Sequence, residues 1–483
     1  MLFSSPIFLF LFLPVTLLGY YFANERYRNY WLLFASFIFF AWGGVSFTFI
    51  LILSIILNYI FGIKIQKNLQ YQTKAYRWLF IGVAVNVLIL GIFKYANFII
   101  KSINDLNELI SVPLIPQTKI LLPIGISFYT FHSLSYLVDI YRGKTKAQPN
   151  ILDLSLYIAM FSQLIAGPII RYSDVWQQLR GRVHTAAKFS YGVERFLIGL
   201  GKKVLLANTF ANIADKIFAM DTVSMGGLNA WLGILCYTFQ IYLDFSGYSD
   251  MAIGLGRMFG FEFLENFNFP YIAKSVKEFW RRWHISLSTF FRDYVYIPLG
   301  GNKLGIGRTY LNLLIVFFLT GFWHGASWSF VVWGLYHGFF MILERLGLGK
   351  VLEKVPGFIS NIYTLIAVIF GWVLFRADSL TYAVDYWKAL FNFSLTDLQL
   401  HTFLGFLNTE LYLVTIFSVL GSFGFFTYFG RLIEIRINSA GRLNGALSVS
   451  FHTISVIFYA SVLFLCSMYL ISGTYNPFIY YRF

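Results

Sequence analysis

The chain has 483 residues, of which 58% are hydrophobic and only 12% are charged, and its mean hydropathy is +0.66. Because a soluble globular domain carries about 25% charged residues, this composition excludes a soluble enzyme. The net charge of +15 gathers in a few loops. Between these loops, apolar runs near the ~20 residues that cross a hydrocarbon core recur from end to end. The composition therefore predicts an all-α, polytopic membrane protein.

The predicted spans follow one another along the whole chain. They cover residues 4–22, 29–44, 46–63, 77–95, 120–138, 153–170, 228–245, 310–324, 326–343, 359–375, 411–430 and 448–471. Because several of these runs are short or interrupted, we expect about eleven crossings together with re-entrant pieces. No basic segment precedes the first run, so we interpret it as a retained span and not as a cleavable signal peptide.

Charge orients these spans across the membrane. The loops that hold Arg26, Arg28 and then residues 64–77 are basic, whereas residues 42–46 between them carry no charge. Since cytoplasmic loops are enriched in Lys and Arg, we expect the N-terminus on the extracytoplasmic side. The basic loop 431–442 precedes the final span, so we expect the C-terminus on the same outer side.

Three stretches do not resemble simple spans, because they mix Pro or Gly with polar residues at apolar depth. They are residues 122–136, 161–172 and 243–261, and the last of them adds Asp244 and Asp250. Irregular or polar backbone is tolerated within a membrane only where protein buries it or where it lines a watery cavity. These stretches therefore predict a central funnel or pore.

Bases alternate with aromatic residues in the stretch 275–305, which reads "SVKEFWRRWHISLSTFFRDYVYIPLGGNKLG". This pattern is typical of an interfacial helix that contacts membrane lipid. Lipid contact alone does not explain His284 or the number of arginines at one mouth. A phosphorylated ligand arriving from the cytoplasm would explain Arg281 and Arg282, since arginine binds phosphate through paired hydrogen bonds.

His324 lies in the long apolar stretch 309–340. A helix from Tyr310 to Trp323 spans only about 21 Å, short of the ~30 Å hydrocarbon thickness. The helix therefore ends inside the membrane beside His324, and Gly325 allows the chain to break there. An ionisable residue at this depth predicts function, and imidazole suits proton transfer at neutral pH. The alternative is a neutral histidine that is hydrogen-bonded between helices.

The remaining histidines and the cysteines have weaker signals. His337 follows on the next helix and could support His324, although packing explains it as well, and His132 lies in a predicted re-entrant stretch. Cys236 and Cys466 each lie within an apolar run without metal-ligand spacing. We expect both cysteines to be buried small apolar residues and expect no metal site.

The C-terminal segment reads "NPFIYYRF", residues 476–483, and carries two phenols, Tyr480 and Tyr481. Its aromatic composition suits a belt that anchors the last helix at the membrane interface. The segment would lie on the extracytoplasmic side if the orientation by charge holds.

Four long motifs resemble the membrane-bound O-acyltransferase (MBOAT) family, within its bacterial branch that acylates cell-envelope polymers. They are "LLPIGISFYTFHSLSYLVDIYRG", "YTFQIYLDFSGYSDMAIGLGRMFGF", "WRRWHISLSTFFRDYVYIPLGGN" and "LTGFWHGASW". The resemblance covers nearly the whole chain. It implies an MBOAT fold, a helical shell around a central funnel, for residues 1–446. Residues 447–483 would then form a final transmembrane helix with an extracytoplasmic tail.

The resemblance also implies residue roles. The family's main catalytic histidine falls on His324, and its supporting histidine falls on His284, on the side where the acyl thioester enters. Acetyl-CoA is the implied donor, and neither a metal nor a nucleic-acid partner is implied. A family motif of the form Phe-x-Tyr-x-x-Phe falls on Phe478, Tyr480 and Phe483. In such systems this tyrosine is thought to hold the acyl group before an extracytoplasmic, SGNH-type O-acetyltransferase collects it.

Acidity makes a phenol carrier reasonable. A thiol has a pKa of about 8.5 and a phenol about 10, and a sugar alcohol is far less acidic. A phenyl ester can therefore form from a thioester and still acylate a sugar. His324 would act as the general base on the phenol, with stabilisation of the oxyanion by a further group. Asn312, Thr320 and Ser327 are candidates for that group.

Two alternatives stay open at this level. D-alanyl transfer to teichoic acids is the alternative within the family, although the fused C-terminal helix favours acetylation. A transporter is the alternative from another class, since it would use the same broken helices and basic mouth. The polymer is also open, because peptidoglycan and an alginate-like polysaccharide both fit.

Overall fold

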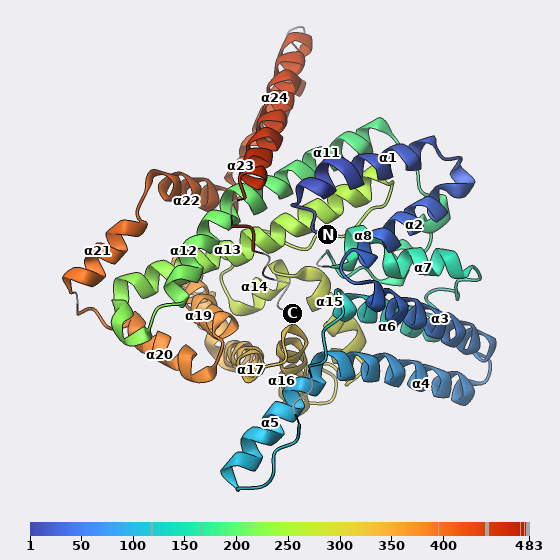
Figure 1. Cartoon of the computed structure of the whole chain (residues 1–483), viewed down its shortest axis with the longest axis horizontal. Coiled ribbons are helices and arrows are strands. Elements are labelled where there is room, and N and C mark those ends of the chain that lie inside the picture. The colour runs from blue at the N-terminus through green and yellow to red at the C-terminus, as the bar shows by residue number, and fades with distance from the viewer. Residues whose placement is uncertain are drawn as a thin grey trace.

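A computed structural model of the chain describes residues 1–116, 119–165, 167–394, 396–439, 444–473, 475–477 and 479. Every regular element within these ranges is a helix (Figure 1), so the all-α prediction is confirmed. Both cysteines are buried and reduced, as expected of small apolar residues.

The first half of the chain forms short and long helices joined by turns and loops. These are α1 (Leu13–Phe22), α2 (Arg28–Ala41), α3 (Val45–Lys67), α4 (Gln72–Leu90), α5 (Ala96–Leu109), α6 (Ile126–Tyr141), α7 (Ile151–Ala159), α8 (Phe161–Leu164), α9 (Tyr172–Val175), α10 (Gln178–Gly181), α11 (Ala186–Gly201) and α12 (Asn208–Phe218). Single turns of π- or 3₁₀-helix adjoin them at η1 (Phe8–Phe12), η2 (Glu25–Tyr27), η3 (Gly91–Tyr95) and η4 (Lys202–Ala207).

The second half begins with the longest helix. Its elements are α13 (Thr222–Met258), α14 (Val276–Arg282), α15 (Ile285–Phe291), α16 (Ile306–His324), α17 (Trp328–Leu343), α18 (Gly349–Leu352), α19 (Gly357–Arg376), α20 (Leu380–Leu390), α21 (Asp397–Phe406), α22 (Thr409–Ser422), α23 (Phe425–Ser439) and α24 (Asn444–Ile471). The shorter turns are η5 (Pro270–Ile272), η6 (Arg292–Tyr296) and η7 (Glu344–Leu348).

Five helices of the described chain are long and apolar enough to cross a membrane. They are Val45–Lys67, Gln72–Leu109, Ile306–His324, Gly357–Arg376 and Val449–Ile471, and the pair α21 and α22, bent by 67°, could make a sixth. The multi-pass class is thus confirmed, whereas the expected number of about eleven crossings is not. Breaks at glycines and polar turns divide several of the predicted spans into helices too short to cross alone.

The centre of the molecule is α13, which is buried along most of its length and lies beside α11 (Figure 1). Glycines allow the two backbones to touch. A Cβ atom added at Gly254 would lie 2.5 Å from the carbonyl oxygen of Gly192, and one at Gly199 would lie 2.4 Å from that of Gly247. Small residues of this kind let membrane helices approach closely, so α11 and α13 form one rigid unit.

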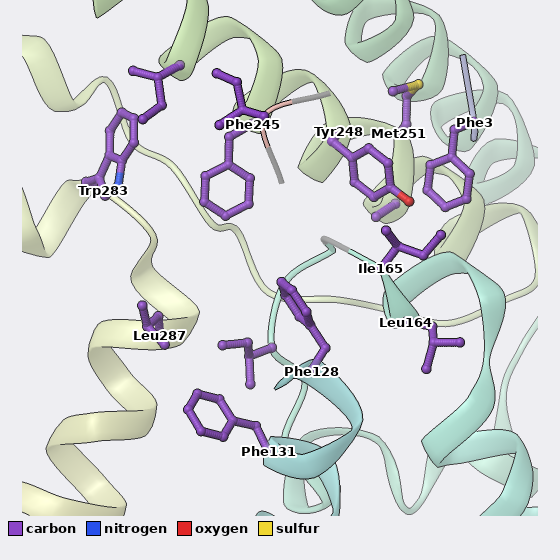
Figure 2. Close-up of a cluster of buried hydrophobic side chains, with 14 of the residues drawn as sticks. Phe3, Phe128, Phe131, Leu164, Ile165, Phe245, Tyr248, Met251, Trp283 and Leu287 are labelled. Carbon is purple, nitrogen blue, oxygen red and sulfur yellow. The ribbon is translucent and has the colours of Figure 1, made fainter. Parts of the chain in front are cut away.

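Aromatic side chains from distant segments fill the interior around this unit. Figure 2 shows Phe128 and Phe131 of α6 gathered with Phe245 and Tyr248 of α13 and with Leu287 of α15. Phe131 also stacks on Trp323 of α16, with ring centroids 5.2 Å apart. The cluster thus joins α6, α13, α15 and the end of α16.

The final helix stands apart from this core. Figure 1 shows α24 extending away from the body, and only 6% of its apolar window is buried. The predicted division into residues 1–446 and 447–483 stays a prediction. The segment after α24 nevertheless contacts the body again at Tyr475–Pro477 and Ile479.

Candidate active site

α16 ends at His324, as the length of the apolar run predicted. Gly325 has an extended backbone, with φ −164° and ψ 151°, and α17 starts three residues later. The two helices form a tight hairpin, since a Cβ atom at Gly334 would lie 2.2 Å from the carbonyl oxygen of Phe317. The close contact holds the end of α16, and therefore His324, at a fixed depth.

The His324 side chain is buried among aromatic rings. Its ring centroid lies 5.1 Å from that of Trp333 and 5.3 Å from that of Phe375. In such an apolar setting charge interactions are stronger than in water, so a proton gained or lost by the imidazole has a large effect on its neighbours.

His284 lies next to His324, as the resemblance implied. It occupies the break between α14 and α15 and adopts left-handed backbone angles, φ 45° and ψ 54°. A non-glycine residue in this region is uncommon and often marks a functional position. The two imidazole centroids are 6.3 Å apart, and both side chains are buried. The structure therefore brings the two predicted histidines into one site.

Asn266 fixes the orientation of His284. Its Oδ1 atom accepts the backbone N–H of Ser286 at 3.2 Å and the Ser286 hydroxyl at 2.8 Å, and it lies 3.1 Å from His284 Nδ1. The backbone donor identifies this atom as the amide oxygen, which only accepts hydrogen bonds. The proton of a neutral His284 ring is consequently on Nδ1, which leaves a lone pair on Nε2.

The Nε2 atom of His284 is buried and has no hydrogen-bond partner within the described part of the chain. The other end of Asn266 is held by Ser249, whose hydroxyl accepts from Nδ2 at 3.0 Å. Sequence reasoning missed Asn266, because "NFNFP" carries no catalytic motif and its contact with His284 depends on the fold. The His284 ring is thus oriented with Nε2 as a proton acceptor.

Lys94 is a second residue that the sequence analysis missed. It lies in the π-turn η3, inside the long span Gln72–Leu109, and its side chain is buried. The ammonium group donates to the Ser127 hydroxyl at 3.1 Å and to the carbonyl oxygen of Trp323. A lone lysine within an apolar run is itself a functional signal, and this signal was available in the predicted span 77–95.

Tyr95, the next residue, donates its hydroxyl to the carbonyl oxygen of Phe322 at 2.8 Å. The π-turn η3 therefore binds two consecutive carbonyl oxygens at the C-terminal end of α16. Such carbonyls have no partner within their own helix, and π-turns occur frequently at functional sites. Lys94 and Tyr95 thus cap α16 beside His324.

Two cavities border the C-terminal end of α16. The larger, of about 1190 Å³, is bounded partly by Thr320, and the smaller, of about 410 Å³, is bounded partly by Gly325. Lys94, Phe375, Arg376 and Ile479 also line the smaller cavity. The residues on the two sides of His324 in the chain therefore border different cavities, Thr320 the larger one and Gly325 the smaller one.

Six basic and three acidic side chains line the larger cavity, which we call the basic cavity. The bases are Lys274, Lys277, Arg281, Arg292, Arg345 and Lys350. One of the acids, Glu344, accepts the backbone N–H groups of Val276 and Lys277 at 2.6 and 3.0 Å. The cavity therefore favours an anionic ligand.

The two predicted phosphate-binding arginines differ in position. Arg281 lines the basic cavity, whereas Arg282 pairs with Glu278 at 2.8 Å and donates to the carbonyl oxygen of Asn268. Burial alone would raise the pKa of Glu278, but the Lys274 backbone N–H and the Arg282 guanidinium hold that pKa below its usual value. Glu278 is thus ionised and engages Arg282 in place of a ligand.

The other predicted residues have less direct places. Asn312 donates to the carbonyl oxygens of Leu299 and Gly301, which is a structural role, while Thr320 and Ser327 line the larger and smaller cavities respectively. His337 is buried and packs on Trp333, and His132 is buried near Tyr157. Phe478, Tyr480, Tyr481 and Phe483 lie outside the described residues.

Residues 74–384 match the model of the membrane-bound O-acyltransferase family, MBOAT, and the chain belongs to this family. It is therefore an O-acyltransferase and a multi-pass membrane protein. A relative from Pseudomonas aeruginosa named "Probable alginate O-acetylase AlgI" is 45% identical over 91% of this chain and 84% of its own length. The "Peptidoglycan O-acetyltransferase" of Helicobacter pylori is 37% identical over 81% of this chain and 80% of its own.

A third relative, the "Teichoic acid D-alanyltransferase" of Streptococcus thermophilus, is 31% identical over 49% of this chain and 60% of its own. The first two of these relatives each match more than four fifths of this chain, and both are named for O-acetylation. These names support membrane O-acetylation of cell-envelope polymers as the process in which the chain takes part.

We predict that Asn266→Ala lowers acyl transfer by about tenfold or more, through kcat more than through KM. The change leaves buried donors of His284 and Ser286 without their acceptor, at a cost of ~1–3 kcal/mol. Asn266→Asp should retain activity but shift the acidic limb of the pH–rate profile to higher pH. A carboxylate favours the protonated imidazole, so a higher pH is needed to free its lone pair.

The control for the two Asn266 variants is Ser249→Ala, because Ser249 contacts Asn266 only through Nδ2. Rates measured with purified enzyme across pH would test both variants. An unshifted profile for Asn266→Asp, with full activity for Asn266→Ala, would contradict the role of Asn266 in orienting His284.

Proposed function

We propose that this O-acyltransferase takes an acetyl group from acetyl-CoA on the cytoplasmic side and passes it to Tyr480. An extracytoplasmic, SGNH-type O-acetyltransferase then moves the acetyl group from Tyr480 to a cell-envelope polysaccharide. The observation that carries this proposal is the turn from Thr320 to Gly325. It bears His324 and reaches a basic cavity at one end and a separate cavity at the other.

The basic cavity suits the donor. Coenzyme A carries several phosphate charges, and arginine and lysine bind phosphate oxygens through strong, charge-assisted hydrogen bonds. Arg281, Arg345 and Lys350 lie on this cavity together with the apolar residues Trp280 and Phe317. Phosphates would bind at the bases, and the thinner pantetheine arm would extend along the apolar residues toward Thr320 and His324.

The smaller cavity suits the acceptor. Ile479 lines it together with Gly325, the residue after His324. Tyr480 follows Ile479 directly in the chain, so its phenol is tethered to a residue of this cavity. This supports Tyr480 over an unconnected acceptor, although Tyr480 itself lies outside the described residues.

The transfer would proceed with His324 as general base. The imidazole takes the phenol proton as the phenol oxygen attacks the thioester carbonyl carbon, so a C–O bond forms and the C–S bond breaks. The proton then passes from the imidazolium to the departing thiolate of coenzyme A. The thiol is the more acidic partner, so the leaving group is the better one and the acetyl group moves to the phenol.

Lys94 and His284 would assist this step. Lys94 brings its amine next to the His324 backbone and also lines the smaller cavity, where it can carry a positive charge once protonated. A fixed positive charge stabilises a developing oxyanion. His284 offers the lone pair of Nε2 within the same buried site and so can orient the His324 imidazole or accept its proton.

The relatives and the charge pattern define the biological setting. The higher identity to the alginate O-acetylase favours an alginate-like polysaccharide over peptidoglycan as the first polymer to test. The basic loops support an extracytoplasmic position for both chain ends, on the side where the proposed partner transferase would act. D-alanyl transfer is less well supported, since that relative matches only about half of the chain.

We predict that His324→Gln lowers polymer acetylation by about 10²–10⁴-fold, because the general base is lost. His337→Gln is a matched control, since His337 is equally buried and packs on the same Trp333 ring. O-acetyl content of the extracted polymer, at equal membrane levels of protein, measures both variants. Retained acetylation in His324→Gln would reject the assignment.

We predict that Arg281→Ala raises KM for acetyl-CoA about tenfold, because a hydrogen bond to a charged partner contributes ~1.5–3 kcal/mol. Arg282→Ala should leave KM nearly unchanged, since Arg282 pairs with Glu278 and is not itself among the residues that line the cavity. Release of free coenzyme A thiol by purified enzyme gives both constants. Equal effects of the two variants would argue against the basic cavity as the donor site.

We predict that Tyr480→Phe abolishes polymer acetylation, whereas Tyr481→Phe retains it. In the native chain an acetyl ester should be detectable by mass spectrometry on the C-terminal peptide when the partner transferase is absent. Full activity of Tyr480→Phe would show that the acetyl group takes another route.

A further inference from the structure

Residues 475–477 and 479 are bound by side chains of the helical body, much as a peptide is bound by a receptor. The Tyr475 hydroxyl donates to Asp215 Oδ2 at 2.6 Å, and Arg376 holds the other oxygen of Asp215 at 2.6 Å. Asn476 accepts from Asn208 at 3.1 Å and donates to the carbonyl oxygen of Ser4 at 3.0 Å. The segment thus contacts α12 and the N-terminal residues.

A buried ion pair lies at the end of these contacts. Lys203 of η4 and Asp244 of α13 are 2.8 Å apart, and each side chain is only 2% exposed. The Lys203 ammonium group also donates to Asn208 Oδ1 and to the carbonyl oxygen of Pro477. Asp244 Oδ2 accepts the backbone N–H of Ile479 at 3.0 Å.

The hydrogen-bonding capacity of the pair is completed by the C-terminal segment. The Lys203 ammonium group, which has three protons, makes an ion pair with Asp244 and donates hydrogen bonds to Asn208 and Pro477. Burying two charges costs several kcal/mol unless further hydrogen bonds satisfy them. Without Pro477 and Ile479, one Lys203 proton and one Asp244 oxygen would lose their partners at a buried position.

A neighbouring ion pair, between Lys202 and Asp250, makes no hydrogen bond with the described residues of the C-terminal segment, unlike the pair of Lys203 and Asp244. Lys202 pairs with Asp250 of α13 at 2.6 Å, and Asp250 also binds Arg195. Within the described residues, the ion pairs and hydrogen bonds of Lys202 and Asp250 join them to each other and to Arg195. Two adjacent lysines thus make similar pairs with one helix, and one of them binds the C-terminal segment.

We propose that the Lys203–Asp244 pair is a peptide-binding site for the chain's own C-terminal segment and sets the register in which the next residue reaches the smaller cavity. The pair binds one backbone carbonyl and one backbone N–H, so it recognises position along the chain more than side-chain identity. The binding role is independent of the reaction, whereas the register role rests on the proposed function of Tyr480.

The position of this site has a specific consequence for the acceptor. Within the described residues the last contact is at Ile479. A residue inserted before Tyr475 therefore lengthens the chain ahead of the site and leaves the bound residues where they are. A residue inserted after Ile479 is not compensated, and it displaces Tyr480 from the place next to the anchored backbone. The site would therefore favour Tyr480 over Tyr481, because Tyr480 is one residue and Tyr481 two residues beyond the bound Ile479.

Digestion of the purified full chain with carboxypeptidase Y tests the binding role without using activity. Trimming past Ile479 should be about tenfold faster in Lys203→Gln than in the native chain, since a buried charged hydrogen bond is lost. Lys202→Gln should be trimmed at the native rate. Intact-mass spectrometry follows the products, and equal rates in Lys203→Gln and Lys202→Gln would overturn the proposal.

A change on the segment side guards against misfolding of the Lys203 variant. Ile479→Pro removes the N–H that Asp244 accepts but leaves Lys203, Asp244 and the helices that carry them unchanged. Ile479→Ala keeps that N–H and serves as its control. Faster trimming of Ile479→Pro than of Ile479→Ala supports the site, and equal trimming overturns it.

Two single-glycine insertions test the register role. A glycine inserted after Gly473 should leave polymer acetylation within about threefold of native, because the bound segment resets the register. A glycine inserted after Ile479 should lower acetylation by about tenfold or more, as misplacement of a reacting group does. Equal loss in both would overturn the register role.

The digestion and the insertions separate this proposal from the function it refines. If Tyr480→Phe were fully active, the relay by Tyr480 would fail, yet the digestion difference between Lys203→Gln and Lys202→Gln would still establish the binding site. If digestion showed no difference while Tyr480→Phe was inactive, the relay would stand and the binding site would fail.

Discussion

A helix that ends inside a membrane must find partners for its last carbonyl oxygens, and this requirement organises the centre of the molecule. Water and lipid cannot supply those partners at this depth. α16 obtains them from Lys94 and Tyr95, which bind the carbonyls of Trp323 and Phe322. The same capping places the Lys94 amine and a fixed helix end beside His324. The cap that the end of α16 requires thus lies next to the proposed catalytic residue.

The hairpin of α16 and α17 has a second effect, on water. Acetyl thioesters and phenyl esters both hydrolyse if water reaches the reacting carbon. His324 is enclosed by Trp323, Trp333 and Phe375, and it is not among the residues that line the basic cavity. A dry, apolar surround excludes competing water and strengthens the electrostatic effects that remain.

Local features of the sequence predicted part of this site. The length of the apolar run and the glycine after it predicted the end of α16, because both depend only on helix rise and membrane thickness. The family resemblance identified His284 and His324 as a pair. Contacts between distant segments were not accessible in this way: Asn266 meets His284 only because the chain before α14 runs along the α14–α15 break.

Helix number and side-chain direction were similarly limited. Apolar length alone could not show that breaks divide several runs into helices too short to cross. Arg281 and Arg282 are equivalent in sequence, but on a helix neighbouring residues point about 100° apart, so one faces the basic cavity and the other binds Glu278.

The hydrogen bond between Asn476 and Ser4 has a consequence for biosynthesis. Residues 475–477 and 479 leave the ribosome after the helices that bind them, so these contacts form late in assembly. Under the proposed function, a chain stalled before that step would hold both histidines but would lack the proposed acceptor segment.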